Sequence, residues 1–303
     1  VWNHCHQKLT MTTSAIAENL KLIYLAAKVR LGFLIMACTL AGIAVSPTSS
    51  LSPLDIFLVS FAVLLCSSTA GAFNQLYERD IDSIMLRTKN RPFVTRDLKP
   101  TTAWNYWLLI LSLAALFLIF QVANFEAALF LFAGTFTYGI VYTVWLKRKT
   151  WMNIVIGGLA GSFAVLVGSA AAGASFATAP VILSVVLFLW TPPHFWALAI
   201  FCKDDYAKAS IPMLPVVASE SITVQAIFWH TLALVLLSLS LIFFGMHWVY
   251  LTFAIIGGFY FLYHSIQLMI KKTPVQAKKT FFASIIHLGL LLVGAMMDAI
   301  IFV

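Results

Sequence analysis

Three oxygen-bearing side chains, Asn74, Glu78 and Asp82, recur every four residues where the second apolar segment of the chain ends. A helix turns about 100° per residue, so each step of four moves the side chain only about 40° around the axis. The three groups therefore line one stripe. Such a stripe would suit Mg2+, which prefers a few carboxylates together with phosphate oxygens. The alternative is a solvated helix end whose acids pair with neighbouring arginines.

A second acidic pair, Asp204 and Asp205, follows the sixth apolar segment. Carboxylates close to hydrocarbon are costly, and in membrane proteins they usually mark a functional site. We expect this pair to lie at the same membrane depth as the first stripe and to share its metal ion.

Basic residues near both acidic groups predict contacts to a diphosphate, namely Arg87, Arg91, Lys147 and Lys203. Arginine and lysine bind phosphate oxygens well, although the same residues would also orient the chain during membrane insertion. Together the acids and cations indicate magnesium-assisted ionisation of an allylic diphosphate. Metal and cations would neutralise the leaving group, and a dry pocket would protect the carbocation.

The elements that must position these groups are membrane-spanning helices. Of 303 residues, 61% are hydrophobic and 10% charged, which excludes an ordinary soluble domain. Windows of about 20 apolar residues recur along the chain. We predict an all-α fold of nine transmembrane helices, at residues 31–47, 55–77, 102–123, 126–146, 152–172, 179–201, 222–244, 248–270 and 281–302.

All 19 lysines and arginines then fall in the N-terminal segment or in the even-numbered connections. By the positive-inside rule the N-terminus is cytoplasmic and the C-terminus lies on the outer side. The net charge of +8 therefore reflects topology and does not indicate a nucleic-acid partner. Residues 1–27 are expected to form a cytoplasmic tail, and residues 28–303 a single transmembrane domain.

Several stretches resemble the UbiA superfamily of intramembrane prenyltransferases, whose first motif is NxxxDxxxD and reads here Asn74, Glu78, Asp82. The glutamate at the middle position is similar to one branch, the heme O synthases. The most specific match to that branch is Trp190-Thr191-Pro192-Pro193-His194-Phe195-Trp196, and the resemblance extends over residues 28 to 220. This chain departs from the pattern in Lys28-Val29-Arg30, where Lys-Pro-Arg is usual, and at Ala164-Val165, where a proline pair is common.

The resemblance implies a UbiA-like helical bundle with a central cavity in the inner (plasma) membrane. It implies transfer of a farnesyl group from farnesyl diphosphate to a vinyl group of heme B, with magnesium as cofactor. Addition of water would then give heme O and diphosphate. A heme A synthase or a terminal oxidase would be a partner that takes the product.

A heme site is predicted near Pro192 and Pro193, which should kink the sixth helix. His194 could bind heme iron, or it could bond to carbonyls that the prolines leave free. Trp190 and Trp196 could stack on the porphyrin, or they could simply pack the bundle.

Two other functions stay open at the level of sequence. The first is prenylation of a quinone-precursor ring, which an assay with both acceptors would separate from heme prenylation. The second is transport or heme handling, since intramembrane acids also mark ion pathways. The acids gather at one face instead of crossing the bilayer, which favours an enzyme.

Overall fold

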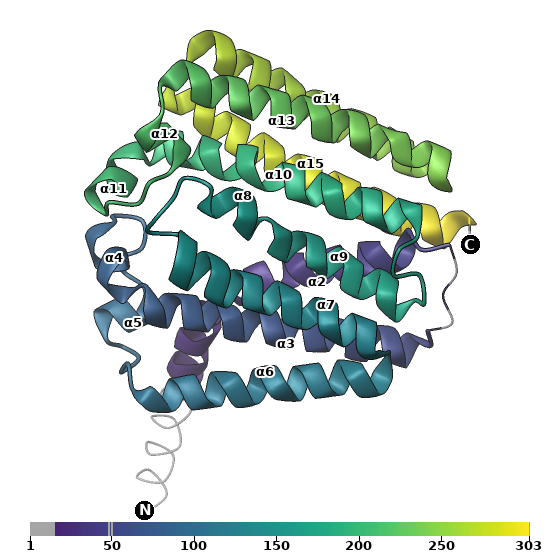
Figure 1. The fold of residues 1–303 in the computed structure, drawn as a ribbon, viewed down its shortest axis with the longest axis horizontal. Coiled ribbons are helices and arrows are strands. Elements are labelled where there is room, and N and C mark those ends of the chain that lie inside the picture. The colour runs from purple at the N-terminus through teal and green to yellow at the C-terminus, as the bar shows by residue number, and fades with distance from the viewer. Residues whose placement is uncertain (1–15, 48, 50, 303) are drawn as a thin grey trace, which may run out of the picture.

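The computed structural model describes residues 16–47, 49 and 51–302, and this part of the chain is helical without any β-strand. Long helices lie side by side in one bundle (Figure 1). In chain order they are α2 (Val29–Ala44), α3 (Pro53–Tyr77), α6 (Thr102–Val122), α7 (Phe125–Phe136) with η1 (Thr137–Leu146), α8 (Asn153–Gly157) with α9 (Leu159–Ala171), α10 (Thr178–Phe201), α13 (Glu220–Ser240) with η2 (Leu241–Phe244), α14 (Trp248–Lys271) and α15 (Pro274–Phe302).

Each of the nine predicted spans coincides with one of these helices, and eight of the helices are by themselves long and apolar enough to cross a membrane. The exception is α2, which has 16 residues. It reaches that length only together with the helix Ile16–Ala26, from which it is bent by 54°. The predicted tail of residues 1–27 therefore contains a helix, Ile16–Ala26, that apolar periodicity does not indicate. The first 15 residues of that tail lie outside the described residues.

Four short helices connect the long ones at a single end of the bundle (Figure 1). They are α4 (Arg79–Ile84), α5 (Pro92–Thr95), α11 (Lys203–Lys208) and α12 (Leu214–Val217). The first two follow α3 and the other two follow α10. Both predicted acidic groups therefore lie at the same end of the molecule.

The helices α2 and α9 cross unusually closely. A Cβ atom on Gly42 would lie 2.1 Å from the Val165 carbonyl oxygen, and one on Gly168 would lie 2.0 Å from that of Thr39. Thr39 Oγ1 also donates to the Ala164 carbonyl at 2.9 Å. Only glycine allows this approach, and α9 stays helical at Ala164 and Val165 without the proline pair. The break in this span falls instead at Gly158, between α8 and α9.

The end of the fourth span is a π-helix, η1. Its backbone bonds reach one residue further than in an α-helix, as in the bond from Lys147 N to Tyr142 O of 2.9 Å. The rings of Tyr138 and Tyr142 stack with centroids 5.7 Å apart. Wide turns of this kind often occur at functional sites.

Candidate active site

The predicted stripe lies at the junction of α3 and α4. Asn74 belongs to the last turn of α3, Glu78 separates the two helices, and Asp82 lies in α4. Their exposed fractions are 2%, 0% and 2%. The alternative of a solvated helix end is therefore wrong for these three groups. Buried polar groups of this kind need partners, because an unpaired buried charge is strongly destabilising.

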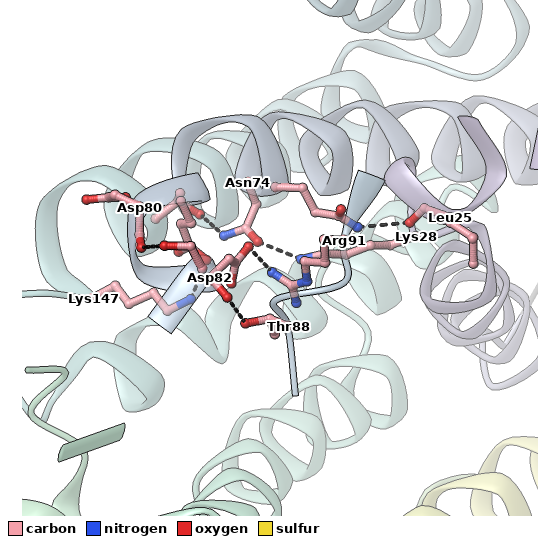
Figure 2. A network of polar contacts seen from close by, with 12 residues as sticks. Leu25, Lys28, Asn74, Asp80, Asp82, Thr88, Arg91 and Lys147 are labelled. Atoms are coloured by element: carbon pink, nitrogen blue, oxygen red, sulfur yellow. Dashed lines mark hydrogen bonds and ion pairs between the residues drawn. The ribbon is translucent and has the colours of Figure 1, made fainter. Parts of the chain in front are cut away.

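Each member of the stripe has a different cationic partner (Figure 2). Arg91 Nη1 lies 2.5 Å from Asp82 Oδ2, and Lys147 Nζ lies 2.5 Å from Glu78 Oε2. Lys28 Nζ donates to Asn74 Oδ1, also at 2.5 Å. Arg91 directly precedes α5, Lys147 directly follows η1, and Lys28 directly precedes α2. Three separate parts of the chain therefore supply the cations.

Lys28 is a site residue that the sequence analysis missed. It has φ 49°, the left-handed conformation, at the bend between the helix Ile16–Ala26 and α2. Its ammonium group also donates to Tyr138 Oη at 3.2 Å. Asn74 Nδ2 in turn donates to Thr143 Oγ1 at 2.9 Å, which fixes the amide with its oxygen toward Lys28. The Lys28-Val29-Arg30 stretch, which corresponds to a family motif, was the sequence feature that could have identified Lys28 as a site residue.

The second acidic pair is less enclosed. Asp205 is buried, and its Oδ2 accepts a long hydrogen bond of 3.4 Å from the backbone N–H of Arg87. Asp204 and Lys203 are exposed, and with Asp205 they line a separate hollow beside Glu220. The structure thus connects Asp205 to the loop that follows the first stripe, but it does not bring Lys203 to the stripe.

A cavity of about 390 Å³ begins at this polar cluster and extends between the helices. Lys28, Arg87, Arg91 and Lys147 line its polar end, together with Asn74. The rest of its wall is mainly apolar and comes from α2, α3, α7, η1, α8, α9, α10 and α15. A site with cations at one end and apolar walls beyond it suits a ligand with an anionic head and a hydrocarbon tail.

His194 and Trp190 line the same cavity from α10. The helix is continuous through Pro192 and Pro193. His194 Nδ1 is 2.7 Å from Ser284 Oγ, so its partner is a side chain of α15 and not a carbonyl freed by the prolines. The imidazole lies between the Trp190 and Phe281 rings, with centroid distances of 4.2 and 4.5 Å.

Trp196 does not reach the cavity. It lies two residues beyond His194, which turns its side chain about 200° away around the helix. Its ring meets His230 of α13 edge-on at 5.2 Å, and its side chain packs in the core on the far side of α10. The expectation that Trp196 stacks on a porphyrin is therefore corrected by helix periodicity.

The donor set offers oxygen ligands, although no three His, Cys, Asp or Glu side chains of the described residues converge tightly enough to form a metal site alone. Within those residues, Glu78 Oε1 is buried without a hydrogen-bond partner. An unpaired carboxylate oxygen deep in such a site fits a hard cation. Magnesium also characteristically takes part of its shell from substrate phosphate and water, so an incomplete protein shell suits it.

Another acid of this region, Asp80, does not line the cavity. It accepts two hydrogen bonds of 2.7 Å from Arg148. This guanidinium holds the pKa of the Asp80 carboxyl below its usual range. Because the Asp80 side chain is 62% exposed, the pair is an ordinary surface salt bridge.

Comparison with known proteins places this geometry in context. The chain is 49% identical to protoheme IX farnesyltransferase 2 of Paramagnetospirillum magneticum, over 94% of this chain and 99% of the relative. It is 38% identical to protoheme IX farnesyltransferase of Rickettsia bellii, over 84% and 85% of the two chains.

Among solved structures, a UbiA homolog from Archaeoglobus fulgidus bound to DMAPP and Mg2+ superimposes with a TM-score of 0.65. The identity is 17%, and the match covers 89% of this chain and 99% of the other. Residues 35–286 match the UbiA prenyltransferase family over most of the chain. The chain therefore belongs to the UbiA prenyltransferase family.

Proposed function

We propose that this multi-pass membrane protein transfers a farnesyl group from farnesyl diphosphate to a vinyl group of heme B. The observation that carries this proposal is the set of three buried cation–oxygen pairs at the mouth of an apolar cavity. The relatives named protoheme IX farnesyltransferase, at 49% and 38% identity, support heme B as the acceptor.

The cations would receive the diphosphate. In the unliganded site Arg91 and Lys147 are paired with stripe carboxylates, and Lys28 donates to the neutral Asn74 amide. The three cations would exchange these stripe oxygens for phosphate oxygens as the substrate arrives. Arg87, which lines the same end of the cavity, would add a further contact. Charge-assisted bonds of this kind strengthen as negative charge grows on the leaving group, which is the requirement for catalysis.

Asn74, Glu78 and Asp82 are the residues that would hold magnesium, with Asp205 and Asp204 approaching from α11. When bound, this ion supplies a positive charge that stabilises the departing diphosphate. Dependence on magnesium is supported by the fold neighbour that binds DMAPP and Mg2+. Glu78 Oε1, a buried carboxylate oxygen without a hydrogen-bond partner among the described residues, would be one of its ligands.

In the reaction, the bond from farnesyl C1 to oxygen breaks and its electron pair leaves with the diphosphate. The π electrons of the heme vinyl group form the new bond to C1, and water captures the resulting cation and loses a proton. Heme O and diphosphate are the products. Tyr138 and Tyr142 line the cavity, where their aromatic rings would stabilise the allylic cation.

His194 and Trp190 border the cavity on the α10 side and would contact the porphyrin. The hydrogen bond between His194 Nδ1 and Ser284 Oγ orients the imidazole. We further propose a cytoplasmic N-terminus in the inner membrane, because all basic residues lie in the segments expected on that side. A heme A synthase or a terminal oxidase would take up the product.

The test incubates the purified protein in detergent with heme B, farnesyl diphosphate and magnesium, followed by mass spectrometry of the extracted hemes. We expect heme O, and we expect EDTA to abolish its formation and added magnesium to restore it. A parallel reaction contains an aromatic quinone precursor in place of heme B. Prenylation of that ring with none of heme would refute the proposal.

A further inference from the structure

The apolar end of the cavity lies at a similar distance from the polar cluster along each of several helices. Its deepest lining residues are each about 14 residues from the helix end that carries the polar cluster, and they are Val63, Leu131, Val167, Leu187 and Leu288. Phe130 lies beside them and stacks on Phe163 at 6.3 Å. These bulky side chains close the cavity.

The depth of the cavity follows from the helix that forms one wall. Asn74 at the polar end and Val63 at the closed end both belong to α3, and 11 residues of helix separate them. At about 1.5 Å per residue this is a depth of about 16 Å. A ligand whose anionic head binds at the cations can therefore extend an apolar chain of limited length before it meets the closed end.

Gly161, in α9, lines the cavity between its two ends and differs from the two glycines before it. A Cβ atom on Gly157 would lie 2.8 Å from the Tyr142 ring, and one on Gly158 would lie 3.0 Å from Thr191 Cβ. A Cβ atom on Gly161 would meet no described atom within 4 Å, and Gly161 lines the cavity. The missing side chain at this position leaves room for a ligand at mid-depth.

We infer that Gly161, together with the closed end formed by Val63 and Leu131, sets the length of the isoprenoid chain that this enzyme accepts. The inference rests on the proposed function, because it assumes that the cavity holds the chain of an isoprenoid diphosphate. A larger side chain at residue 161 would project into the cavity at mid-depth and reduce the length available to the isoprenoid chain. A smaller side chain at the closed end would lengthen it.

The experiment compares geranyl, farnesyl and geranylgeranyl diphosphates as donors to heme B, with kcat/KM measured for each. In Gly161→Leu, the ratio of farnesyl to geranyl turnover is expected to fall by about tenfold or more, the discrimination that a few methylene groups produce in an apolar pocket. Gly161→Ala should change the ratio in the same direction by less. It keeps the inference testable if the leucine variant does not fold.

Gly289→Leu is the matched control. This glycine is also helical and half-buried, a Cβ atom there would meet no described atom within 4 Å, and the residue does not line the cavity. Its donor selectivity should equal that of the wild type. In the opposite direction, Val63→Ala should raise the ratio of geranylgeranyl to farnesyl turnover.

Unchanged donor selectivity in the Gly161 variants would overturn the inference, as would a rise in KM for heme B with no change among the three donors. Neither result would affect the proposed function. That proposal fails only if the wild-type protein forms no prenylated heme from any donor. The two failures are therefore distinguishable within one set of assays.

Discussion

The two acidic groups of this protein lie at the same end of the bundle but in different surroundings. The first stripe is fully enclosed, and each of its members contacts a basic side chain from another part of the chain. The second pair has one buried member, Asp205, whose carboxylate accepts a long hydrogen bond from a backbone N–H, and one exposed member, Asp204.

The two groups therefore differ in how much folding free energy their burial costs. Enclosing charges among apolar helices costs several kcal/mol per ion unless partners compensate. A cluster that keeps such charges buried at the end of a cavity is therefore a stronger candidate for chemistry than a solvated pair. In the second pair only Asp204 is exposed, and no basic side chain is paired with either carboxylate among the described residues.

The largest expected effect is at Glu78. Glu78→Gln removes the carboxylate while keeping its shape, and we expect turnover to fall about a hundredfold or more, as when one preorganised electrostatic group is lost. The variant also leaves Lys147 without its counter-charge, which should cost roughly 3–5 kcal/mol of unfolding free energy. Steady-state heme O formation and thermal unfolding in detergent measure the two effects.

A double variant, Glu78→Gln with Lys147→Met, separates stability from chemistry at this pair. It should recover most of the lost stability, because no charge stays unpaired, while its activity should stay low. If Glu78→Gln alone were fully active, the buried pair would be structural and the comparison between the two acidic groups would lose its meaning.

An intermediate effect is expected within the second pair. Asp205→Asn weakens the contact to the Arg87 backbone, and turnover should fall about tenfold to a hundredfold, the range for groups that orient a metal site. Asp204→Asn, on the adjacent exposed residue, should change turnover much less. Magnesium titration of both variants measures this difference, and equal losses would show that exposure is a poor guide here.

The smallest effect is expected at the surface pair of Asp80 and Arg148. The pKa of Asp80 is lowered in the folded protein, so its contribution is present above the unfolded pKa of about 4 and disappears as the pH falls through the lower folded value. For an exposed pair this contribution is about 0.5 kcal/mol or less. Asp80→Asn should therefore lower the unfolding temperature slightly at pH 7, and by progressively less as the pH falls below about 4, with unchanged activity.

Sequence periodicity was sufficient for the spans and for the stripe. Apolar windows located nine helices, and a spacing of four residues placed Asn74, Glu78 and Asp82 together. It was not sufficient for their partners, because Lys28 is 46 residues from Asn74 and Lys147 is 69 residues from Glu78. Which helix stands beside which depends on packing between distant segments, and charge distribution reports only the side of the membrane.

The error at Trp196 had a different origin. The WTPPHFW stretch was treated as one motif, although Trp190 and His194 share a helix face and Trp196 occupies the opposite one. Geometry already present in the sequence would have separated them. The π-helix had no comparable signal, since its turns depend on local backbone bonding and not on a residue pattern.

In the π-helix η1, the number of residues matters more for the position of Lys147 than the identity of each side chain. Residues 137–146 have more residues per turn than the flanking α-helix. They therefore change the direction in which the side chains after them project from the helix axis. Adding or losing one residue there would rotate Lys147 by roughly a quarter of a turn relative to α7. Substitutions along this stretch should therefore be tolerated better than the insertion or deletion of a residue. An insertion or deletion would move the Lys147 ammonium group away from Glu78.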